Sequence, residues 1–166
     1  QEETRCQCAL YEADQQIIAA VNYLVNRRKC KVVVVGADDT DVAIRLTSLY
    51  DTLVSATNSI IGLLRGKSSN KQWVDLYEVS VKIKETFPFA LRGYVLKSLT
   101  GFHAFTGSDH TSQFEGVTKA CAWTNLTRAC EIDEVLGKEF LLALAAFGTP
   151  DFEKEREVLQ QFSTSK

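Results

Sequence analysis

The 166-residue sequence contains no methionine. It also lacks long apolar runs and a strong net charge of either sign. No stretch reaches the roughly 18 to 20 apolar residues of a membrane-spanning helix, and the first residues do not resemble a signal peptide. The formal net charge is −2, so charge alone does not indicate a nucleic-acid partner. Such a partner is still compatible with the composition if acidic residues gather at a metal and basic residues lie elsewhere. Because even an initiator methionine is missing, we expect a piece of a longer protein.

Paired cysteine motifs are missing as well. The five cysteines are odd in number and include no Cys-x-x-Cys spacing, which is typical of free thiols in a reducing compartment. We therefore expect an intracellular protein, nuclear or cytoplasmic. Cys6 and Cys8 could join His103 or His110 in a zinc site, but their spacing does not match the usual structural patterns. Free cysteines are the favoured interpretation.

Apolar residues make up 45% of the chain, enough for one domain with a sizeable core. Four consecutive valines in 31–36 predict a strand buried on both faces, as in a parallel sheet. Further strands are predicted at 59–64 and 72–76. Residues 1–9 are expected to form a flexible start. Helices are predicted over 14–29, after Asp41, over 77–86 and 89–105, after Gly116, and over 132–147 and 151–162.

The spacing of apolar residues indicates which helix faces are buried. The positions expected to be buried are Ile17, Val21, Leu24, Val42, Leu46, Leu49, Leu53, Leu136, Phe140, Leu144 and Phe147. The order of elements indicates an α/β sheet layer followed by a helical region. In open α/β sheets, sites form beyond the carboxyl ends of the strands. The acidic residues Asp38, Asp39 and Asp41 directly follow the predicted strand 31–36.

Asp39 and Asp41 are separated by one residue. In extended backbone at a strand tip their side chains would point to the same side. Two carboxylates that close repel each other unless a cation lies between them, and hard oxygen ligands suit Mg²⁺ or Mn²⁺. The alternative interpretation is a helix start capped by Asp38 or Asp39.

Each of three further acids could be either a metal ligand or part of ordinary local structure. Glu12 and Asp14 would lie on opposite faces of a regular helix, so both could bind metal only in its first turn or the approach to it. The alternative is ordinary negative charge at a helix start. Asp109 follows Thr106, Gly107 and Ser108 and could equally form a turn.

Together these segments resemble proteins of eukaryotic transposable elements. The resemblance rests on Glu-Ala-Asp at 12–14, on the strand ending Asp-Thr-Asp-Val at 39–42, and on residues 99–116. That pattern is similar in turn to PIN-like, flap-endonuclease-type nucleases. The resemblance implies a Rossmann-like three-layer sandwich with a mainly parallel sheet and a C-terminal helical region. It implies two-metal phosphodiester hydrolysis of DNA or RNA with Mg²⁺ or Mn²⁺, the metal and catalytic ligands being Glu12, Asp14, Asp39, Asp41 and Asp109.

The resemblance also implies a nucleic-acid contact at Gly116 and Lys119, where the family grips the backbone of its substrate. It gives His103 a structural role and makes His110 at most a neighbour of the site. The family's fold begins with a strand that carries a first aspartate. We therefore expect residues 1–166 to be one partial domain whose N-terminal strand and first ligands are missing.

Two alternatives stay open. One is a catalytically inactive PIN-like module that binds nucleic acid or protein. The other is a phosphotransferase of the haloacid dehalogenase type, with Asp39 as its nucleophile. In that alternative Ala43 stands where the family usually has Thr or Val, and no convincing downstream lysine is followed by an acidic pair.

Overall fold

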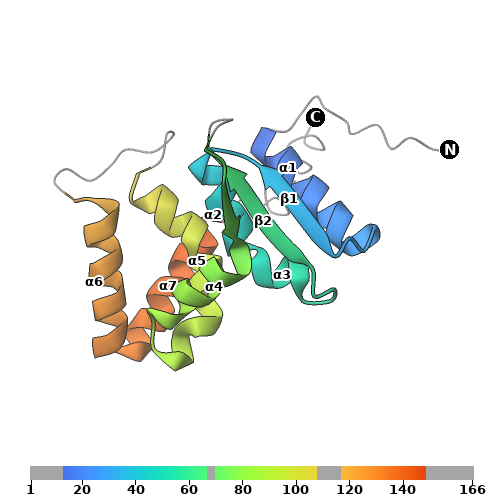
Figure 1. Ribbon diagram of the computed structural model, residues 1–166. Helices are drawn as coiled ribbons and strands as arrows, with labels where there is room; N and C mark the ends of the chain where they lie inside the picture. Colours follow the sequence, from blue (N-terminus) through green and yellow to red (C-terminus); the bar gives the residue numbers. More distant parts are fainter. Residues whose placement is uncertain (1–12, 67–69, 108–116, 149–166) are drawn as a thin grey trace, which may run out of the picture.

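The computed structural model describes residues 13–66, 70–107 and 117–148 (Figure 1). Several predicted features lie outside the described residues. These are the start at 1–9, Cys6, Cys8, Glu12, Asp109, His110, Gly116 and the helix at 151–162.

The first half of the chain builds the sheet layer. Helix α1 (Ala13–Asn22) continues into the π-helical turn η1 (Tyr23–Arg27), and strand β1 (Val32–Gly36) follows. Helices α2 (Thr40–Ser48) and α3 (Tyr50–Val54) lead to strands β2 (Ile60–Arg65) and β3 (Gln72–Asp75). The second half is helical: α4 (Leu76–Glu85), η2 (Phe89–Leu91), α5 (Arg92–Phe105), α6 (Lys119–Ile132) and α7 (Glu134–Gly148). The predicted α/β layer followed by helices is confirmed.

The described sheet has the order β1-β2-β3 and is mixed. Strands β1 and β2 are parallel, with Val33 opposite Ile61, whereas β2 and β3 are antiparallel, with Leu63 opposite Val74. The expectation of a mainly parallel sheet is therefore wrong for these three strands. Residues 66–71 link β2 to β3, and so short a link cannot make the crossover of a dozen or more residues that parallel strands need.

Only one face of β1 is covered by the described helices. Val33 and Val35 point into the core, but Val32 and Val34 are each 55% exposed. Within the described residues, therefore, β1 is buried on one face and not on both. A valine run fits any pleated strand, because β-branched side chains favour strands whether one face or both are covered.

Two buried clusters hold the fold together. The first packs the covered face of the sheet against α1, α2, α4 and α5 and includes Leu46 and Ile61. The second joins α5, α6 and α7 around Val95 and Leu141. Trp123 packs against both clusters. Helices α6 and α7 approach closely at Gly137, where an added Cβ would lie 2.9 Å from Cys130.

The predicted buried faces of the helices were partly wrong. Leu24 and Leu49 are 37% and 39% exposed, and Tyr50 is buried instead of Leu49 because α2 ends at Ser48 and α3 begins at Tyr50. In α7 the buried apolar side chains are those of Leu141 and Leu144. Apolar residues cover more than one side of α7, so spacing alone could not select its buried face. The three other positions predicted there are exposed: Leu136, Phe140 and Phe147.

No helix within the described ranges has both the length and the apolar character needed to cross a membrane.

Candidate functional site at the carboxyl end of the parallel strands

Asp38 ties the carboxyl ends of the two parallel strands together. Its Oδ1 accepts a hydrogen bond from the Gly66 N–H at 2.5 Å, and its carbonyl oxygen accepts one from the Arg65 guanidinium at 2.6 Å. Gly66 has a φ of +106°, a conformation that favours glycine. These contacts fix the turn after β1 and leave Asp38 with a structural role.

Asp39 caps α2. Its backbone is extended, and its Oδ1 accepts a hydrogen bond from the Asp41 N–H at 2.8 Å. The predicted alternative of a capped helix start is therefore confirmed for Asp39. Asp41 already belongs to the first turn of α2, so the expectation of extended backbone at both aspartates is wrong.

Asp41 begins a chain of polar contacts that joins three helices. Its Oδ1 lies 2.7 Å from Nε2 of His103 in α5, and Nδ1 of the same imidazole lies 2.7 Å from Nζ of Lys119 in α6. A protonated lysine can only donate, so Nδ1 accepts from Lys119 and Nε2 donates to Asp41. The Asp41 and His103 side chains are only 29% and 14% exposed, which weakens the competition from water.

Asp14, in the first turn of α1, forms an ion pair with a residue of α2. Its Oδ2 lies 3.5 Å from Nε of Arg45, and the two side chains are 20% and 36% exposed. Arg45 lies four residues, about one helical turn, beyond Asp41. The start of α1 and the start of α2 therefore lie at the same end of the fold, as Figure 1 also shows.

The described acids do not complete a metal centre by themselves. Among residues 13–66, 70–107 and 117–148, no three His, Cys, Asp or Glu side chains are grouped so that they could hold a metal ion. Asp14, Asp39 and Asp41 offer the hard oxygen donors that Mg²⁺ prefers, but one oxygen of each already has a partner within the protein. Glu12 and Asp109, the other two predicted ligands, lie outside the described residues.

The contacts of His103 with Asp41 and Lys119 were not predicted from the sequence. They are compatible with the structural role that the resemblance implies. One signal was available: His103 lies four residues after the buried Leu99, on the side of α5 that faces the sheet layer. A polar side chain at such a position needs a polar partner.

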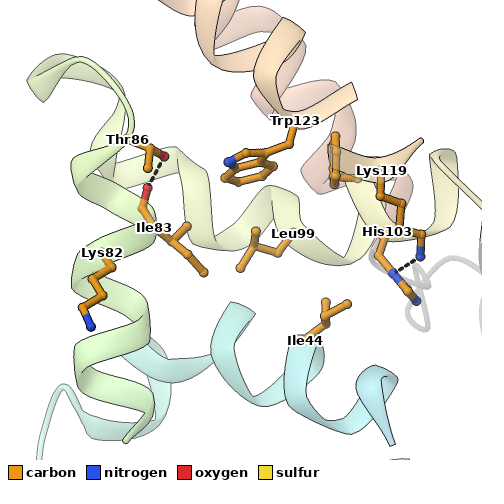
Figure 2. A pocket seen from close by; sticks show the side chains of 9 residues that line it. Ile44, Lys82, Ile83, Thr86, Leu99, His103, Lys119 and Trp123 are labelled. Atoms are coloured by element: carbon orange, nitrogen blue, oxygen red, sulfur yellow. Dashed lines mark hydrogen bonds between the residues drawn. The ribbon is translucent and has the colours of Figure 1, made fainter. Parts of the chain in front are cut away.

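A pocket of about 380 Å³ opens beside this network, between α2, α4, α5 and α6 (Figure 2). His103 and Lys119 line it, so the pocket and the polar chain share two residues. Most of the remaining wall is apolar, and none of the described lining residues is acidic. The described residues that line it are Ile44, Lys82, Ile83, Thr86, Leu99, Phe102, His103, Lys119 and Trp123.

Comparison of the chain with protein-family models, with curated proteins and with solved structures found no match.

Proposed function

We propose that the chain belongs to a metal-dependent nuclease of the PIN-like, flap-endonuclease type, as in proteins of eukaryotic transposable elements. The observation that best supports the proposal is the 2.7 Å contact between Asp41 and His103. It joins the Asp-x-Asp segment after β1 to the helix that leads into Gly107-Ser108-Asp109. These are two of the three acidic segments on which the resemblance rests.

Chain geometry supports a shared site for all three segments. Asp109 follows Gly107 by two residues, which span at most about 7 Å. Glu12 directly precedes Ala13, the first residue of α1, and Asp14 pairs with Arg45 of α2. The carboxyl ends of β1 and β2, the start of α1 and the end of α5 lie at one end of the molecule (Figure 1). The proposed fold is a three-layer sandwich, whose second helical layer would cover the valines that are exposed on β1.

The proposed metal is Mg²⁺ or Mn²⁺ in a two-metal site. When bound, such ions activate a water and stabilise the leaving oxygen of a phosphodiester. In the proposal Asp39, Asp41 and Asp109 would be the principal ligands, and Glu12 and Asp14 would complete the set. His103 is a positioning residue, because its bond to Asp41 fixes the orientation of that carboxylate.

The proposed substrate is DNA or RNA. Lys119 supports this because its ammonium group is held beside the acidic end of the fold by His103. A lysine there can pair with a phosphate next to the one that is cleaved. Gly116, which lies three residues before Lys119 at the approach to α6, would offer a backbone N–H to the same phosphate.

The test is cleavage of flap and single-stranded DNA and RNA with Mg²⁺ or Mn²⁺ by the protein that contains this chain. Asp39→Asn is the sharpest variant, because asparagine still caps α2 but lacks the negative charge that a metal needs. Asp75→Asn is the matched control. Asp75 caps α4 with the same geometry, its Oδ1 accepting from the Tyr77 N–H at 2.8 Å.

We expect Asp39→Asn and Asp41→Asn to abolish cleavage and Asp75→Asn to preserve it. Cleavage that survives both site variants would refute the proposal. Failure of the unaltered protein to cleave with either metal would favour the inactive nucleic-acid- or protein-binding module. A trapped aspartyl-phosphate on Asp39 would favour the phosphotransferase.

A further inference from the structure

The pocket between α2, α4, α5 and α6 has features of a ligand site. Its volume of about 380 Å³ lies in the range of roughly 300 to 1,000 Å³ that small-molecule sites cover. Figure 2 shows side chains from all four helices converging on it, with Trp123 on one side and Ile44 on the opposite side. The pocket is therefore built by packed helices and does not depend on a loop.

An aromatic wall is already fixed in place. The Trp123 ring meets Phe87 and Phe102 edge to face, at centroid distances of 5.2 and 5.1 Å. Trp123 nevertheless remains half-buried, so part of the indole still faces the pocket. A planar ligand would find this surface ordered before it binds, which lowers the entropic cost of binding.

The charge of the pocket lining limits the chemical class of ligand that can bind there. Among the described residues that line it, Lys82 and Lys119 are the only formally charged side chains, and both are positive although the whole chain has a net charge of −2. Lys119 is held at one end by His103. The walls between the lysines are formed by apolar side chains, chiefly Ile44, Ile83 and Leu99. The matching ligand has a flat apolar body and an attached anion.

We propose that this pocket holds one unpaired nucleobase of a single-stranded nucleic acid, against Trp123, with the neighbouring phosphate paired to Lys119. The inference rests on the proposed function and deepens it, since it selects a single-stranded substrate and places one nucleotide beside the acidic end of the fold. Base stacking on aromatic side chains tolerates every base, because each base has a π-face. The pocket therefore provides affinity for single strands without strong sequence preference.

Binding is measured without divalent metal, so that it does not depend on catalysis. The chain has two tryptophans, and Trp73→Phe leaves Trp123 as the only one that fluoresces. The probes are a short oligothymidylate and an abasic oligonucleotide of the same length and charge. Decanoate tests the alternative of a fatty acid. Ile44→Phe narrows the pocket without removing charge, and Lys119→Gln removes one cation. Lys97→Gln is the control, because Lys97 is exposed on α5 and does not line the pocket.

We expect oligothymidylate to quench Trp123 fluorescence saturably and to bind about tenfold more tightly than the abasic strand. Ile44→Phe should remove that preference. Lys119→Gln should weaken both strands and lower the salt dependence of binding by about one ion, while Lys97→Gln should leave the Trp123 quenching and the preference for the base unchanged. Equal binding of the two strands, or quenching by decanoate alone, would overturn the pocket proposal.

Failures of the two proposals differ. Base-dependent quenching in a protein that does not cleave would retain the pocket and reject the nuclease. Metal-dependent cleavage with equal binding of both strands would retain the nuclease proposal and reject the pocket proposal.

Discussion

The imidazole of His103 lies 2.7 Å from the carboxylate of Asp41, although the two residues are 62 positions apart in the sequence. This contact fastens the C-terminal part of α5 to the first turn of α2. It is one of the contacts between α2 and α5 that hold the acidic end of the sheet layer next to the helical region.

The Asp41–His103 contact should contribute measurably to stability. We expect a double-mutant cycle of Asp41→Ala and His103→Ala to give a coupling of about 1 kcal/mol, because a hydrogen bond to a charged group is involved and both side chains are largely shielded from water. Urea denaturation of the four proteins measures it. The Asp51–Lys84 pair is the control: it has a similar distance of 2.7 Å, but Asp51 is 56% exposed. That pair should give less than about 0.5 kcal/mol, and an equal value for both pairs would contradict the special role of His103.

The packing of α6 on α7 predicts opposite effects of one substitution at two helical glycines. Gly137→Ala would place its Cβ 2.9 Å from Cys130, so it should destabilise the fold by about 1 to 3 kcal/mol. Gly93 of α5 has no atom within 4 Å of an added Cβ, so Gly93→Ala should stabilise by about 0.5 kcal/mol. Thermal unfolding measures both. Similar changes in the two variants would show that α6 and α7 do not pack as described.

The cysteines should differ in reactivity. Burial raises the pKa of the Cys130 thiol, so at about pH 8 little thiolate is present there, whereas Cys121 is exposed. We expect iodoacetamide to label Cys121 at least about tenfold faster than Cys130, as followed by peptide mass spectrometry. The difference should vanish in denaturant. Fast labelling of Cys130 in the folded protein would contradict its burial.

Local sequence signals predicted the elements well where one signal dominated. The valine run marked β1, and the short turn-rich segment after Arg65 marked the break before β3. They did not predict the direction of β3, because a strand's own residues do not carry its orientation; the length of its connection does. They also failed on the buried face of α7, where apolar residues surround the helix.

The candidate site could also be predicted only in part, because some of its contacts join residues that are far apart in the sequence. Asp39 and Asp41 could be located from the strand that precedes them, and Asp39 as a cap from its place before α2. The pairing of Asp41 with His103 joins residues far apart in sequence, and only the packing of α5 on α2 creates it. The pocket was equally hidden, because its walls come from four helices.

The most direct test of the central claim is where Mn²⁺ binds. Amide signals of the isotopically labelled chain are followed by NMR during substoichiometric addition of Mn²⁺, whose paramagnetism broadens nearby signals. We expect the signals of Asp14, Asp39 and Asp41 to broaden first, and those around Asp133, an acidic cap at the start of α7, to broaden last. Asp39→Asn should weaken the effect at the site. Equal broadening at Asp133 and at Asp39, or no preference among acidic residues, would contradict a metal site at the carboxyl end of the parallel strands.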